Sequence, residues 1–193
     1  MKKLFPRSYQ FILASASPRR KILLKKAGYR FKIVPSHVSE NHSNHLKPAA
    51  LVKMLALKKA ISISKRFPNE IVLGADTLVY VNQHLIGKPR SLKHAQRILQ
   101  ELSGAWQRVY TGVAVVWDGG KGKRCSAAVS YVKFRTLKRE EIEQVSKKHL
   151  DKAGAYSIQE KGDDFVECLH GDYDNVVGLP IKLVKKLLRG AGV

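Results

Sequence analysis

Residues 11–28 constrain the fold most strongly, because they have the pattern of a strand, a tight loop and a helix. The short apolar run Phe11-Ile12-Leu13 is typical of a buried strand. Ser17 then occupies the N-cap position of a helix, Pro18 its first position and Gly28 the position just past its end. A strand that leads through a short loop into a helix predicts an α/β chain.

The first turn of this predicted helix carries an unexpected charge. Arg19, Arg20 and Lys21 crowd the N-terminus, where the helix dipole disfavours each cation by about 0.3–1 kcal/mol. The arrangement makes sense if an anion binds there, because backbone N–H groups, the Ser17 hydroxyl and two guanidinium groups would converge on phosphate oxygens. A plain basic surface helix is the alternative, and this stretch alone does not separate the two.

The remaining pattern favours an α/β fold with a long, strongly twisted mixed sheet, in one domain over residues 1–193. Apolar runs and turn signals predict a hairpin joined by Asp118-Gly-Gly120, a strand leading to Gln159 and a structured loop over 171–180. The predicted strands are 11–13, 31–34, 71–81, 109–117, 125–134 and 165–169; the predicted helices begin near residues 18, 48, 91, 138 and 180.

Two charged residues stand where apolar ones are expected. Lys59 falls in the middle of the apolar stripe of the helix over 48–66, so its side chain either snorkels to water or reaches an anion. Asp76 lies in the segment Gly74-Ala-Asp-Thr77, which interrupts the apolar strand over 71–81. A turn capped by Asp76 would explain it, but we favour a functional acid, because an isolated buried carboxylate is costly.

Three further polar residues stand out. Glu40 is the sole acid before residue 70, which suits either an ion pair or a metal ligand. Lys88 is held between Gly87 and Pro89, so its backbone is constrained. Gln159 ends a predicted strand with an amide that both donates and accepts hydrogen bonds, as the edge of a base requires, although an ordinary strand-end residue would look the same.

The charge balance narrows the classes of partner. The net charge of +21 favours polyanions such as nucleotides or nucleic acid, and it allows weak non-specific nucleic-acid binding. No local motif interleaves aromatic and basic residues as an RNA-recognition sheet does. No apolar run approaches the roughly 20 residues of a membrane span, so we expect a cytoplasmic chain without membrane contact. Cys125 and Cys168 match no metal-binding spacing.

Eight short segments, in order along nearly the whole chain, resemble the Maf family of septum-formation-inhibitor-like nucleotide pyrophosphatases. They are Ala14-Ser-Ala-Ser-Pro-Arg-Arg20, Gly74-Ala-Asp-Thr77, Gly87-Lys-Pro89, Leu102-Ser-Gly104, Tyr110-Thr-Gly112, Leu150-Asp-Lys-Ala-Gly-Ala-Tyr156, Ile158-Gln159 and Asn175-Val-Val-Gly-Leu-Pro180. The resemblance implies a two-lobed Maf/ITPase-like fold with a central cleft, and often a homodimer. It also implies hydrolysis of nucleoside triphosphates to the monophosphate and pyrophosphate with a divalent cation (Mg, Mn or Co).

The resemblance assigns roles to residues that the physical reading had already marked. Phosphate binding falls on a set of basic and hydroxyl side chains, namely Ser17, Arg19, Arg20, Lys59 and Lys88. Asp76 becomes the catalytic acid, with Glu40 as its partner in holding the metal.

Three positions resemble the branch of the family that acts on dTTP and UTP, a substrate class in which we include modified pyrimidine nucleotides: Arg19, Thr77 and Gln159. A glutamine amide pairs with the O4/N3–H edge of uracil or thymine, which agrees with that branch. Glu160 departs from the glycine usual there. The alternative hypothesis is a catalytically weak nucleic-acid-binding or cell-division regulatory protein on the same fold.

Overall fold

A computed structural model describes residues 9–39, 46–87, 89–148, 154 and 164–193 of the chain. Three predicted site residues, Glu40, Lys88 and Gln159, lie outside this part. The elements are β1 (Phe11–Leu13), α1 (Pro18–Lys26), β2 (Phe31–Ile33), α2 (Pro48–Ser64), β3 (Val72–Val81), β4 (His84–Ile86), α3 (Leu92–Leu102), β5 (Trp106–Trp117), the single turn η1 (Asp118–Gly120), β6 (Gly122–Phe134), α4 (Arg139–Ser146), β7 (Val166–His170), α5 (Tyr173–Val177) and α6 (Ile181–Arg189).

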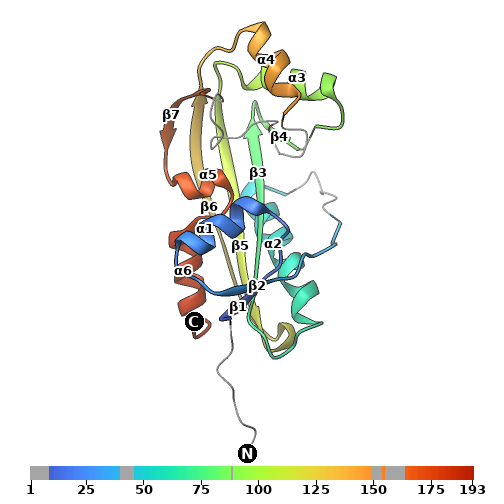
Figure 1. The fold of residues 1–193 in the computed structure, drawn as a ribbon, viewed down its shortest axis with the longest axis vertical. Helices are drawn as coiled ribbons and strands as arrows, with labels where there is room; N and C mark the ends of the chain where they lie inside the picture. Colours follow the sequence, from blue (N-terminus) through green and yellow to red (C-terminus); the bar gives the residue numbers. More distant parts are fainter. Residues whose placement is uncertain (1–8, 40–45, 88, 149–153, 155–163) are drawn as a thin grey trace, which may run out of the picture.

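One mixed sheet organises the fold, as the sequence pattern predicts (Figure 1). Its strands run in the order β2-β1-β3-β5-β6-β7, and β4 pairs with β3 beside this path. The pairs β1–β2 and β1–β3 are parallel, and the other pairs are antiparallel. The long strands β3, β5 and β6 run the length of the molecule, so they carry both halves of the core.

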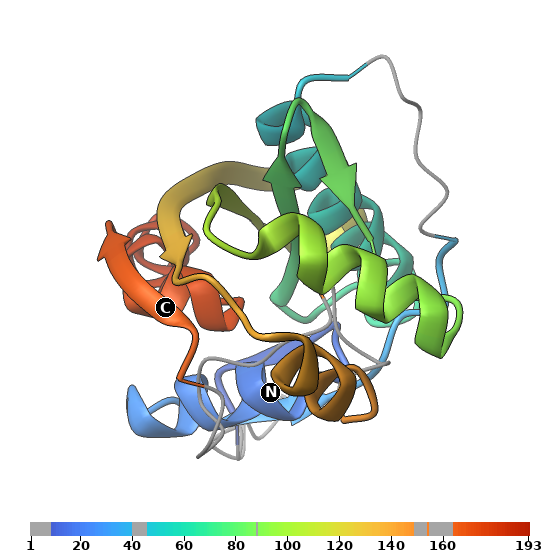
Figure 2. The same ribbon diagram turned by 90° about the horizontal axis from the view of Figure 1, so that it is seen from above.

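The helices cover the two ends of the sheet differently. In the half near the termini, α1 and α6 pack on one face, with Leu24, Val184 and Leu188 in the core, while α2 packs on the other face. In the far half, α3 and α4 lie on the concave side of the curved sheet (Figure 2), where Leu99 and Phe134 are fully buried. No helix among the described residues is long and apolar enough to cross a membrane.

Two glycines let α2 lie directly on the sheet. A Cβ at Gly74 would collide with the carbonyl oxygen of Ala56, and one at Gly112 with that of Val52. Both obstacles are backbone atoms of α2, so they cannot rotate away as a side chain would. This close approach is what a glycine inside a strand indicates, and it brings Lys59 of α2 up to β3.

Two expectations from the sequence are wrong. Residues 74–77 do not interrupt the strand: β3 is continuous, because each of them pairs with β5 in an unbroken antiparallel ladder. The loop over 171–180 contains the helix α5, which begins where the Asp172 side chain accepts a hydrogen bond from Asp174 N and ends at Gly178, with φ of +117°. The hairpin of β5 and β6 is confirmed, and the strand leading to Gln159 falls outside the described residues.

Candidate active site

Among the described residues, no strand pairs with the middle of the β3 edge that lies opposite β5. On this edge β1 pairs with Val72 and Leu73, and β4 pairs with Val79 to Val81. Residues 74–78 lie between, where neither strand reaches them. Unpaired edge groups bind other ligands readily, and the loop that follows β1 leads past this segment into α1. The site is built around this stretch of β3.

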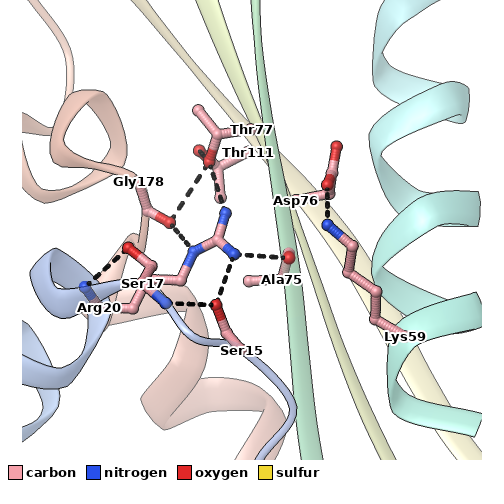
Figure 3. Close-up of polar contacts among 9 residues, drawn as sticks. All are labelled: Ser15, Ser17, Arg20, Lys59, Ala75, Asp76, Thr77, Thr111 and Gly178. Atoms are coloured by element: carbon pink, nitrogen blue, oxygen red, sulfur yellow. Dashed lines mark hydrogen bonds and ion pairs between the residues drawn. The ribbon is translucent and has the colours of Figure 1, made fainter. Parts of the chain in front are cut away.

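Arg20 fills part of the gap from one face of β3 (Figure 3). Its guanidinium donates to Gly178 O at 2.9 Å, Ala75 O at 2.9 Å, Ser15 Oγ at 3.1 Å and Thr77 Oγ1 at 3.1 Å. The side chain is 9% exposed. These acceptors come from the β1–α1 loop, β3 and the α5–α6 turn, so Arg20 ties three distant segments together.

A chain of hydroxyl and amide groups extends this contact across the sheet. Thr77 Oγ1 lies 3.0 Å from Thr111 Oγ1, and Thr111 donates to the carbonyl oxygen of Asn175 at 3.1 Å. The Asn175 amide donates in turn to Val109 O and to Ser130 Oγ, both at 2.9 Å. Because Thr111 and Asn175 are fully buried, these bonds fix α5 on the sheet and with it the turn that binds Arg20.

On the other face of β3, Lys59 and Asp76 form a buried ion pair (Figure 3). The Lys59 ammonium donates to Asp76 Oδ1 at 2.5 Å, and the side chains are 10% and 7% exposed. The sequence left two alternatives open for Lys59, and the contact with a carboxylate is the one that the structure shows. Each charge offsets much of the desolvation cost of the other.

The two groups lie at the same level of β3 but point away from each other. Successive residues of a strand face opposite sides of the sheet, so Ala75 and Thr77 face Arg20 while Asp76 faces α2. The structure therefore brings together Arg20 with Thr77, and Lys59 with Asp76, as two pairs. Asp76 lies inside β3, so the strand itself separates its side chain from that of Arg20.

Ser17 and Arg19 occupy the N-terminus of α1 beside this segment. Ser17 Oγ accepts a hydrogen bond from Arg20 N at 3.5 Å, which confirms its predicted N-cap position. Ser17 N donates to Ser15 Oγ at 3.3 Å. The Ser15 hydroxyl therefore accepts hydrogen bonds both from the N-cap residue and from the Arg20 guanidinium. Arg19 is half-buried. The first turn of α1 contains no acidic residue, so its dipole and basic side chains favour an anion.

The donor set fits a cation bound mainly by a substrate. Within the described ranges, His, Cys, Asp and Glu form no group of three that would hold a metal ion. Asp76 offers one carboxylate, and Glu40 lies outside those ranges. Mg²⁺ usually binds through one or two carboxylates together with substrate phosphates and water, so the single buried acid Asp76 fits such an ion.

Several residues of the site were not singled out from the sequence. Ser15, Thr111, Asn175 and Gly178 all hold Arg20 or the helix that receives it. Each belongs to one of the short segments that resemble the Maf family, but the resemblance assigned them no role. Polar residues that act through one another across four elements have no signature in local spacing.

The comparisons with known proteins agree with this geometry. A family model described as "Maf-like protein" matches residues 10–191. Three relatives bear the name dTTP/UTP pyrophosphatase. That of Elusimicrobium minutum is 43% identical, covering 95% of this chain and 99% of the relative; that of Moorella thermoacetica is 46% identical, covering 95% and 96%; that of Bacillus anthracis is 45% identical, covering 92% and 94%. The chain belongs to the Maf family.

Proposed function

We propose that the chain hydrolyses dTTP and UTP to the nucleoside monophosphate and pyrophosphate, with a divalent cation. It is a Maf-family enzyme, a hydrolase that acts on nucleoside triphosphates, and its named relatives match over nearly their whole length. In the reaction water adds to the α-phosphorus, the bond from that phosphorus to the bridging oxygen breaks, and pyrophosphate leaves. Modified pyrimidine nucleotides belong to the same proposed substrate class.

The observation that carries this proposal is the buried pair of Lys59 and Asp76 beside the unpaired segment of β3. A carboxylate and an ammonium group held 2.5 Å apart are two of the groups that phosphoryl transfer requires. Such transfer depends on positioning and on charge stabilisation more than on covalent chemistry. The substrate's triphosphate would compete for Lys59 and so free the carboxylate for water or for the cation.

Asp76, together with Glu40, is the proposed binding site for the cation. A bound Mg²⁺ or Mn²⁺, for which carboxylate oxygens are suitable ligands, would neutralise phosphate charge and lower the pKa of a bound water. The Asp76 carboxylate either accepts the proton of the attacking water or only holds the cation. In both cases replacing its charge by an amide removes the function.

The proposed phosphate contacts come from Ser17, Arg19, Lys59 and Lys88, together with the N–H groups that begin α1. Arg20 remains a proposed phosphate contact, but the structure already supplies four oxygen acceptors to its guanidinium. A phosphate would have to replace one of them. The bonds support a second role in the same site, in which Arg20 holds the β1–α1 loop against β3 while its charge attracts the triphosphate.

Base selection is proposed for Gln159, Thr77 and Arg19. The Gln159 amide would pair with the O4/N3–H edge of uracil or thymine. Thr77 already contacts Arg20 and Thr111, so its effect on substrate choice would act through the position of Arg20.

The Asp76→Asn variant tests the proposal with pyrophosphate release as the readout. We expect its kcat with dTTP to fall by about 100-fold or more, which is the range for loss of a general base or a metal ligand. Asp118→Asn is the matched control, because Asp118 is an exposed carboxylate in the hairpin turn. Turnover of dTTP near the parent rate in Asp76→Asn would contradict the assignment, and a preference for purine triphosphates in a substrate panel would contradict the pyrimidine branch.

A further inference from the structure

Four side chains line up across four strands in the half of the sheet far from the termini. In the registers of the ladders, Tyr80 of β3 lies opposite Arg108 of β5, Arg108 opposite Tyr131 of β6, and Tyr131 opposite His170 of β7. Residues in register share one face of a sheet. At about 4.8 Å between strands, the row is roughly 14 Å wide.

Trp106 extends this row into a continuous surface, which we call the aromatic sheet face (Tyr80, Trp106, Arg108, Tyr131 and His170). The Trp106 ring stacks on the His170 ring, with centroids 5.4 Å apart and planes at 21°. The Arg108 guanidinium lies 6.0 Å from the ring centres of both Tyr80 and Tyr131. Trp106 is 47% exposed and Tyr131 44% exposed, so flat rings and one cation face solvent together.

The opposite side of these strands already has its partner. Val109 and Val132, which alternate with the residues of the aromatic sheet face, are buried against α3 and α4 on the concave side of the sheet (Figure 2). The aromatic sheet face is on the convex side, which it shares with α2. There α2 packs lower down, against Leu78 and Tyr110. Large exposed aromatic groups of this kind mark a binding surface.

The charges indicate what binds there. Arg108 is exposed, and its guanidinium lies near the rings of Tyr80 and Tyr131, so its charge is accessible to a ligand on this face. Lys133 on the same face pairs with Glu167 at 3.0 Å, so this local pair is neutral. The first turns of α2 below carry Lys47 and Lys53 and no acid. The net charge of +21 attracts a polyanion to such a surface.

We propose that the aromatic sheet face binds single-stranded nucleic acid by stacking bases on Trp106 and Tyr131 while Arg108 contacts the phosphates. Stacking on aromatic side chains above a cationic surface is how many proteins hold single strands without sequence preference. The site is separate from the proposed hydrolytic centre at Asp76, so either can fail without the other. Its residues are far apart in the chain and meet only in the folded sheet, which is why no local motif indicated it.

A titration of the full-length chain with a short oligothymidylate tests this proposal, and quenching of Trp106 fluorescence is the measure of binding. The chain has two tryptophans, and the Trp106→Phe variant identifies the share of the signal that Trp106 contributes. We expect quenching that weakens as salt rises, and a Kd about tenfold higher in Tyr131→Ala, the scale of one lost stacking contact. Arg108→Gln should also weaken binding and lower the salt dependence.

Matched controls separate this surface from general charge and from the nucleotide site. Tyr173→Ala removes a tyrosine of similar exposure on α5, and Arg97→Gln an exposed arginine on α3; both should bind like the parent. Excess dTMP, which would occupy the nucleotide site, should leave binding unchanged. Equal binding by Tyr131→Ala and Tyr173→Ala, or displacement by dTMP, would overturn the proposal. So would a self-association, seen by sedimentation, that Tyr131→Ala abolishes without changing oligothymidylate binding.

Discussion

The two faces of β3 at residues 75–77 each hold a buried cation, but they hold it differently. Arg20 donates to oxygen atoms of four residues. Two of these oxygens are backbone carbonyls and two are hydroxyls, so none of these acceptors is charged. Lys59 binds a carboxylate, that of Asp76. The first arrangement joins segments far apart in the chain, whereas the second sets two opposite charges side by side.

This difference indicates which face of β3 is better suited to bind a substrate and a cation. Backbone carbonyls cannot change their charge or leave, so the bonds of Arg20 favour one fixed geometry. A lysine and a carboxylate both exchange partners when a polyanion or a cation enters, because each has a strong alternative ligand. This contrast supports the proposal that the Lys59–Asp76 face is the reactive part of the site and the Arg20 face its support.

The largest expected effect comes from removing the support. Arg20→Met removes the side-chain donor to Ala75 O and leaves Gly178 O with only the longer bond from Thr77 Oγ1 at 3.4 Å. We expect a loss of about 3–5 kcal/mol in the free energy of unfolding. Urea denaturation measures it. Arg19→Met, a change at the neighbouring half-buried position, should cost less than about 1 kcal/mol. If both variants lose the same small amount, Arg20 does not hold these segments together.

The sequence predicts the helices that carry Arg20 and Lys59, but it does not predict which segments these two side chains contact. Capping signals place Ser17 and α1 correctly, and the apolar stripe of α2 marks Lys59 as unusual. The position of Asp76 inside β3 was misread, because Gly74 suggested a break and its real role is contact with α2. That α5 and its turn reach Arg20 depends on long-range pairing of β5 and β6, which spacing along the chain does not encode.

The second prediction tests whether the reactive pair is replaceable. Lys59→Met leaves the Asp76 carboxylate buried without its ammonium partner, so we expect a loss of about 3 kcal/mol in the free energy of unfolding. In the double variant Lys59→Met/Asp76→Asn the charge is gone, and more than half of this loss should be recovered. Losses that simply add would show that the two side chains are not coupled in the folded chain.

The smallest expected effect concerns Asp174, for which no ion pair like that of Asp76 is found within the part of the chain that the structure describes. Burial, and then the neighbouring Asp172, raise the pKa of Asp174 above its ordinary 3.8, although Lys26 and Lys182 oppose the rise. A carboxyl whose pKa is higher in the folded state favours folding most when protonated, so this contribution is lost as the pH rises from about 4 through the raised pKa.

Asp174→Asn should therefore stabilise the chain at pH 7, by less than about 0.5 kcal/mol because solvent screens a partly exposed group. The gain should shrink as the pH falls below 3.8 and disappear at about pH 2, where the parent carboxyl is protonated in both states. Urea unfolding at several pH values measures the difference between variant and parent. A gain that stays constant down to pH 3 would mean that it comes from contacts of the new amide group. The difference between Asp174 and the ion-paired Asp76 would then not be a difference in charge stabilisation.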